Sequence, residues 1–78
     1  MPNKLSNITL NEYRKFLTHV GCKCIRQNKG HEHWANKDIN RPLTFQSHIE
    51  PIPEFIIKQH LRYLNMSKNE FLDIMNSL

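Results

Sequence analysis

Three short stretches with the character of β-strands follow one another in the middle of the chain, at 22–27, 31–36 and 43–48. A tight turn over 28–30 separates the first two, and a longer loop over 37–42 separates the second and third. Strands joined by short connections pair antiparallel. The middle of the chain therefore predicts a three-stranded antiparallel sheet.

An amphipathic helix is expected before this sheet, over 9–20. Thr9 and Glu12 have the T-x-x-E spacing of a capping box, and apolar residues then recur at helical intervals. Gly21 follows the last of them, as is typical of the residue after a helix. The first helix therefore has a start and an end in the sequence.

Two more helices are expected after the sheet, over 53–64 and 67–76. A proline lies in the first turn of the former, and the latter begins with a second capping box, Ser67 and Glu70. The order α-β-β-β-α-α predicts an α+β fold in a single domain spanning 1–78. Helices on one face of the sheet, with the other face open, is the simplest packing.

The pairing of the strands decides which side chains share a face, because alternate residues of a strand point to opposite faces. The positions of the turns predict these pairs: His31 with His48, His33 with Gln46, Trp34 with Phe45, Cys24 with Trp34, and Ile25 with His33. The core face would then hold Cys22, Cys24, Trp34, Leu43 and Phe45. The open face would hold Lys23, Ile25, Gln27, His31, His33, Ala35, Thr44, Gln46 and His48. We also expect Phe16 and Phe55 in the core.

The composition favours a polyanionic partner. Lys and Arg outnumber Asp and Glu by 11 to 7, and the part up to His48 carries the whole excess. A chain of 78 residues has no room for a deep cofactor cavity, so no cofactor is expected and any chemistry belongs on an open face. Nucleic acid is a substrate large enough for such a face.

Three histidines gather on the open face in this register: His31, His33 and His48. Histidine exchanges protons near neutral pH, so one imidazole can take the proton of a ribose 2′-hydroxyl while a second group protonates the leaving oxygen. Cationic side chains stabilise the charge that builds on the phosphate oxygens. This chemistry cleaves RNA without a metal ion.

Zinc is the competing interpretation, because Cys22-x-Cys24 and His31-x-His33 supply the ligand types of a structural zinc site. Strand parity opposes it, since the cysteines would face the core and the histidines would face solvent; only a bulge would bring the four together. We therefore expect no metal site. The two cysteines are closely spaced and we recognise no signal peptide, so we expect a cytoplasmic protein. No long apolar run occurs, so we expect no membrane partner.

A family resemblance rests on the segment 25–34, which reads Ile-Arg-Gln-Asn-Lys-Gly-His-Glu-His-Trp, and on its context. A helix ending in Val20-Gly21 precedes it, and Leu-Thr-Phe-Gln-Ser-His follows at 43–48. Together they resemble the HicA toxins, small bacterial proteins that cleave mRNA. The family carries glycine-serine-histidine after its first hairpin turn, often continued as histidine-glutamate-x-tryptophan. This chain departs from it with Lys29-Gly30 in place of glycine-serine.

The resemblance implies a fold like that of the double-stranded-RNA-binding domain, with a short C-terminal helix added here. It places the family's catalytic histidine on His31 and a second family histidine on His48, and it implies a HicB-like antitoxin as a protein partner. We expect mRNA as the substrate. The residues expected to contact it are Arg26, Lys29, Gly30, His33, Lys37 and Arg41.

Two other functions remain open from the sequence. One is an RNA-binding module of the same fold without catalysis, and the other is a zinc-stabilised interaction domain. Purified protein distinguishes the first from a ribonuclease, because it would shift single-stranded RNA without degrading it.

Overall fold

A computed structural model describes residues 5–78 and has the expected α+β fold. The elements are α1 (Leu10–His19), β1 (Lys23–Asn28), β2 (His31–Ala35), β3 (Leu43–Gln46), α2 (Glu54–Tyr63) and α3 (Lys68–Ser77). The three strands form one antiparallel sheet in the order β1-β2-β3. The expected class and element order are thus confirmed.

The local signals for the helices are confirmed by their caps. Thr9 and Ser67 each form a complete capping box, with Glu12 and Glu70 respectively. In α2, Pro53 is the N-cap and makes no side-chain capping bond, and Asn65 follows the helix with a φ of 54°. Pro53 thus directly precedes α2 instead of lying in its first turn, where the sequence predicts it. Asparagine tolerates the left-handed conformation that Asn65 adopts after the helix.

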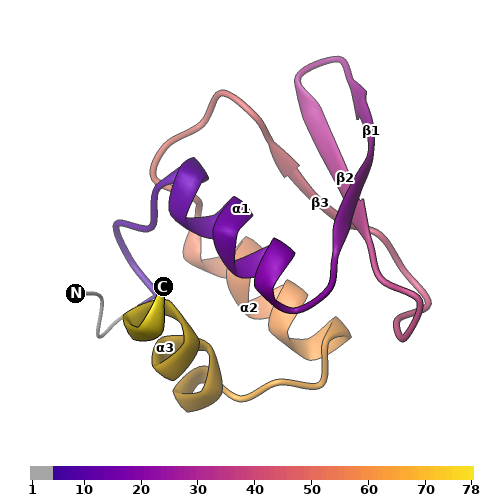
Figure 1. Cartoon of the computed structure of the whole chain (residues 1–78). Coiled ribbons are helices and arrows are strands. Elements are labelled where there is room, and N and C mark those ends of the chain that lie inside the picture. Colours follow the sequence, from indigo (N-terminus) through magenta and orange to yellow (C-terminus); the bar gives the residue numbers. More distant parts are fainter. Residues whose placement is uncertain (1–4) are drawn as a thin grey trace.

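The core lies between the sheet and the helices. Tyr13 of α1 packs edge-on against Phe45 of β3, with ring centroids 5.4 Å apart. Phe16 meets Phe71 of α3 at 4.6 Å. Trp34 is buried, as expected. In Figure 1 the β1–β2 hairpin extends beyond the helices, and all of β1 is exposed.

The pairing of β1 with β2 is partly as expected. Cys24 pairs with Trp34, but a bulge at Ile25 brings Arg26, rather than Ile25, opposite His33. The prediction that Cys24 is in the core is wrong, because β1 is an edge strand and the thiol is exposed. The two-residue turn pairs Asn28 with His31, one residue away from the predicted register, and the bulge restores that register at Cys24. The prediction that Gln27 shares the face of the histidines is wrong, because Gln27 pairs with Glu32.

The pairing of β2 with β3 differs from the prediction by two residues. His31 lies opposite Gln46, His33 opposite Thr44, and Trp34 opposite Leu43. Asn36 ends β2 early: its side chain accepts from the backbone N–H of Asp38, and its carbonyl accepts from that of Ile39. The loop is therefore centred one residue earlier than expected.

A shift by two residues preserves the alternation of faces. Leu43 and Phe45 remain in the core, and Thr44 and Gln46 remain on the side of the histidines. His48, however, falls outside β3 and has no strand partner. Phe55, expected in the core, is 70% exposed. Within residues 5–78, no helix is both long and apolar enough to cross a membrane.

Candidate active site

His31 is the first residue of β2 and directly follows the hairpin turn. Lys29 and Gly30 form this turn with φ angles of 53° and 77°, and positive values at both central residues are those of a type I′ hairpin turn. Nδ1 of His31 lies 3.1 Å from the carbonyl oxygen of Lys29. A carbonyl only accepts, so Nδ1 donates, and in the neutral ring the lone pair of Nε2 is free.

His48 lies in the segment after β3, against the same turn. A Cβ built on Gly30 would lie 3.1 Å from Cε1 and 3.2 Å from Nδ1 of its ring. The carbonyl of Gly30 accepts hydrogen bonds from the backbone N–H of Ser47, at 2.8 Å, and from its hydroxyl, at 3.0 Å. These bonds hold His48 beside the residue that precedes His31, although the two histidines are not cross-strand partners.

His33 lies two residues further along β2, on the same face. Its Nδ1 is hydrogen-bonded to the hydroxyl of Thr44 at 3.0 Å, and the ring is half-buried. Arg26 is its partner across the hairpin. His33 therefore has a fixed orientation beside an exposed cation, which suits contact with a phosphate.

The expected RNA-binding cations divide into two groups at opposite ends of the sheet. Arg26 and Lys29 are exposed at the hairpin end, near His31. Lys37 and Arg41 are in the loop between β2 and β3, at the far end. Arg41 lies over the ring of Tyr63, 5.3 Å from its centroid. Lys37 and Arg41 are thus not brought together with His31.

Beneath His31 and His33, the core side of β2 holds a buried carboxylate that sequence reasoning missed. Glu32 is 1% exposed and forms an ion pair with Arg14 of α1, and it accepts a hydrogen bond of 3.0 Å from the indole N–H of Trp34. Burial raises the pKa of Glu32, but the hydrogen bonds from Arg14 and Trp34 outweigh it and hold that pKa below its ordinary value. The alternation along β2 was the available signal, because it places Glu32 on the face of Trp34.

A second buried polar group, His60 of α2, was also missed. Its Nε2 donates to the carbonyl of Thr44 at 3.0 Å, so Nδ1 accepts from the hydroxyl of Tyr13 at 2.6 Å. Burial lowers the pKa of His60 to about 4. The ring is therefore neutral at pH 7. His60 falls on the apolar stripe of α2 between Ile57 and Leu61, which was the signal in the sequence.

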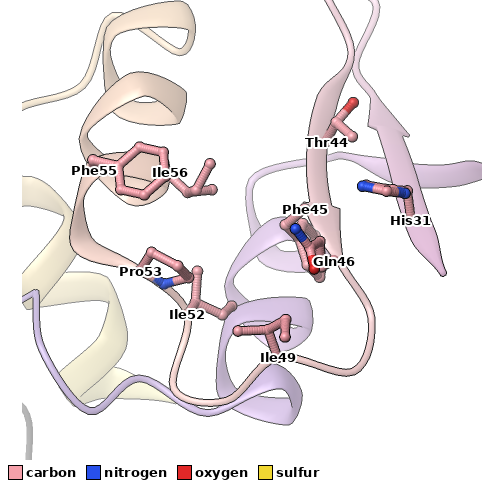
Figure 2. Close-up of a pocket in the computed structure, with 9 residues that line it drawn as sticks. All are labelled: His31, Thr44, Phe45, Gln46, Ile49, Ile52, Pro53, Phe55 and Ile56. Carbon is pink, nitrogen blue, oxygen red and sulfur yellow. The ribbon is translucent and has the colours of Figure 1, made fainter.

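A pocket of about 200 Å³ opens next to His31. Figure 2 shows its two sides: His31, Thr44 and Gln46 stand on the strands, and Phe55 and Ile56 stand on α2 across from them. Further apolar side chains from the segment between β3 and α2, including Ile49, complete the lining. The sequence does not predict this pocket, because the predicted core position of Phe55 is wrong and its ring is exposed at the pocket instead.

The ligand types of the zinc interpretation are dispersed. Cys22 is buried, Cys24 is exposed, and His31 and His33 share the opposite face of the sheet. Burial raises the pKa of the Cys22 thiol. In the part of the chain that the structure describes, no three His, Cys, Asp or Glu side chains are placed to hold a metal ion.

Neither a protein-family model, nor a curated protein, nor a solved structure matches this chain.

Proposed function

We propose that this protein is a HicA-like toxin, an endoribonuclease that cleaves mRNA in the cytoplasm with His31 as its general base. The observation that carries the proposal is the hydrogen bond from Nδ1 of His31 to the carbonyl of Lys29. It fixes the ring and leaves Nε2 as the proton acceptor. The neighbouring cations Arg26 and Lys29 supply the positive charge that a phosphate needs.

The proposed reaction is an internal transfer at one phosphodiester. Nε2 of His31 takes the proton of the ribose 2′-hydroxyl, and the 2′-oxygen forms a bond to phosphorus. The bond from phosphorus to the 5′-oxygen of the next nucleotide breaks, and that oxygen receives a proton from a second group, for which His48 is the candidate. The products are a 2′,3′-cyclic phosphate and a 5′-hydroxyl. No metal ion takes part in these steps.

The test is cleavage of a single-stranded RNA by wild-type protein, by His31→Ala and by a control, His19→Ala. His19 is an exposed histidine in the last turn of α1. We expect His31→Ala to lose about 10²- to 10⁴-fold in rate and the control to lose nothing. A 2′-deoxy nucleotide at the cleavage point should abolish the reaction, and EDTA should not.

The outcomes discriminate between the functions. A folded His31→Ala protein that cleaves at the wild-type rate would contradict the role of His31. A wild-type protein that shifts RNA without cleaving it would be an RNA-binding module. Growth arrest on expression, lost in His31→Ala, would support the toxin assignment.

A HicB-like antitoxin is part of the same proposal and follows from the resemblance of the segment 25–34. Such a partner would cover the face of the sheet that carries His31. Addition of the antitoxin should then stop cleavage by wild-type protein, and His31→Ala should still bind it, because removal of one imidazole leaves the rest of the face intact.

A further inference from the structure

The pocket beside His31 combines an apolar wall with a polar edge. Phe55 is 70% exposed and Ile49 is 39% exposed, and both line the same pocket, so they form a continuous apolar surface with its other lining residues rather than single exposed side chains. Facing them across the pocket are the amide of Gln46 and the imidazole of His31 (Figure 2). The chain therefore leaves an apolar surface open at the place where the proposed chemistry occurs.

The size and charge of this pocket restrict its occupant. Its volume of about 200 Å³ is below the roughly 300–1,000 Å³ of sites for drug-sized ligands. The side chains that line it include no lysine, arginine or carboxylate among the described residues. A phosphate would be held poorly there, whereas a small, uncharged and planar group fits.

A nucleobase has these properties. It has two apolar faces that stack on aromatic side chains, and its edge carries hydrogen-bond donors and acceptors. Phe55 supplies an aromatic ring, and the amide of Gln46 can both donate and accept. Gln46 is also the cross-strand partner of His31, so an occupant at the amide is next to the proposed general base.

We infer that the pocket is a base-binding subsite, which holds one unpaired nucleobase of the RNA while its ribose lies beside His31. The inference rests on the proposed function and deepens it. A base that enters the pocket cannot remain paired, so the substrate is single-stranded RNA. The fit of the base to the pocket then selects the nucleotide at which the chain is cut.

Binding can be tested without cleavage, by following the isoleucine methyl signals in NMR spectra. Ile49, Ile52 and Ile56 line the pocket, and Ile25 and Ile74 lie outside it. We expect saturable shifts of the three pocket methyls on addition of nucleoside monophosphates, with one base preferred. Ribose 5-phosphate and inorganic phosphate should leave these methyls unchanged. Equal shifts with ribose 5-phosphate, or no shifts with any nucleotide, would overturn the inference.

The matching variant is Phe55→Ala, with Leu78→Ala as its control. Both side chains are exposed, at 70% and 51%, and Leu78 lies outside the pocket. Phe55→Ala should remain folded and weaken nucleotide binding by at least about fivefold, the lower end for loss of one stacking contact. Leu78→Ala should bind as the wild type does. Equal binding by both variants would contradict a stacking role for Phe55.

Cleavage then separates this inference from the proposed function. Phe55→Ala should lower the rate on single-stranded RNA and relax the preference for one nucleotide, and a duplex of the same sequence should resist the wild type. If cleavage requires His31 but is the same in Phe55→Ala as in the wild type, the base-binding subsite is contradicted and the ribonuclease activity is supported. If nucleotides shift the pocket methyl signals but the protein cleaves no RNA, the ribonuclease activity is contradicted and the base-binding subsite is supported.

Discussion

The imidazole of His48 lies against the α-carbon of Gly30, so closely that a Cβ at this glycine would be 3.1 Å from Cε1 of the ring. Gly30 also has a φ of 77°, which disfavours a side chain at this position. The positive φ and the close approach of the His48 ring thus both favour glycine at position 30. A side chain there would disturb His48, the second histidine of the proposed site.

Gly30→Ala should therefore affect both stability and cleavage. The strain of the left-handed conformation should lower the free energy of unfolding by about 1–2 kcal/mol, and the new methyl group should displace His48. We expect slower cleavage and a changed NMR signal for the His48 ring. The stability is measured by urea unfolding.

Gly21→Ala is the matched control, because Gly21 has a φ of 89° but its nearest neighbour is the Asn36 side chain, at 3.5 Å from a built Cβ. It should be destabilised by a similar amount and keep its rate per folded molecule. A Gly30→Ala protein whose His48 signal is changed but whose rate is unchanged would show that His48 does not act in the reaction.

The two groups of cations predict different dependences on RNA length. Replacement of Arg26 and Lys29 by alanine should weaken binding of a dinucleotide and of a longer RNA alike. Replacement of Lys37 and Arg41 should weaken only the longer RNA, because the strands separate these residues from His31 by roughly 13–17 Å at about 3.3 Å per residue.

The measurement is the salt dependence of binding to a long single strand. Each lost phosphate contact should reduce the slope of log K against log salt by about 0.7. If the slope of the Arg26 and Lys29 variant equals that of the wild type, these side chains do not contact phosphate in the complex.

Much of the fold follows from local signals in the sequence, and the site follows less completely. The capping boxes at Thr9 and Ser67 define two helices because each uses only neighbouring residues. The alternation along β2 predicts the faces of His31 and His33, since it survives a shift of the register by two residues.

The differences arise where the residue types allow more than one turn or more than one environment. The end of β2 depends on the turn made by Asn36, and this turn moved His48 out of the strand. Phe55 lies on the side of α2 opposite the stripe of Ile57 and Leu61, so helical spacing indicates exposure, and the prediction of a core position follows only from its residue type. The hydrogen bond that orients His31 depends on the backbone geometry of the turn at Lys29. The residue types allow this geometry but do not require it, so the sequence does not predict the bond.

Glu32 should contribute to stability in a way that depends on pH. Its pKa in the folded protein is below its ordinary value, so its contribution is fully present above the pKa of the unfolded chain and is lost as the pH falls through the folded value. Glu32→Ala should lower the free energy of unfolding at pH 7 by about 1–3 kcal/mol, because the Trp34 indole loses its buried acceptor.

Glu32→Gln keeps an acceptor for Trp34 and should cost less than Glu32→Ala. Both are measured by urea unfolding at pH 7 and at low pH, where the difference from the wild type should shrink. A cost that stays constant over this range would mean that packing, rather than the charge of Glu32, stabilises the pair with Arg14.

His60 should make the protein less stable in mild acid. Its pKa of about 4 in the folded protein lies below the value of about 6.5 in an unfolded chain, so the unfolded state binds more protons between these values. The contribution of His60 to the free energy of unfolding should be constant above about pH 6.5. It should then fall towards pH 4, by up to about 1.4 kcal/mol per pH unit.

The variant that isolates this effect is His60→Gln, with His19→Gln as the control. His60→Gln removes the titrating group and should flatten the difference in unfolding free energy between pH 6.5 and 4, while it lowers stability at pH 7 because the Tyr13 hydroxyl and the Thr44 carbonyl lose a partner. His19 is exposed, so His19→Gln should leave the profile unchanged. A wild-type slope retained in His60→Gln would assign the acid sensitivity to the carboxylates, with Glu32 the first to examine.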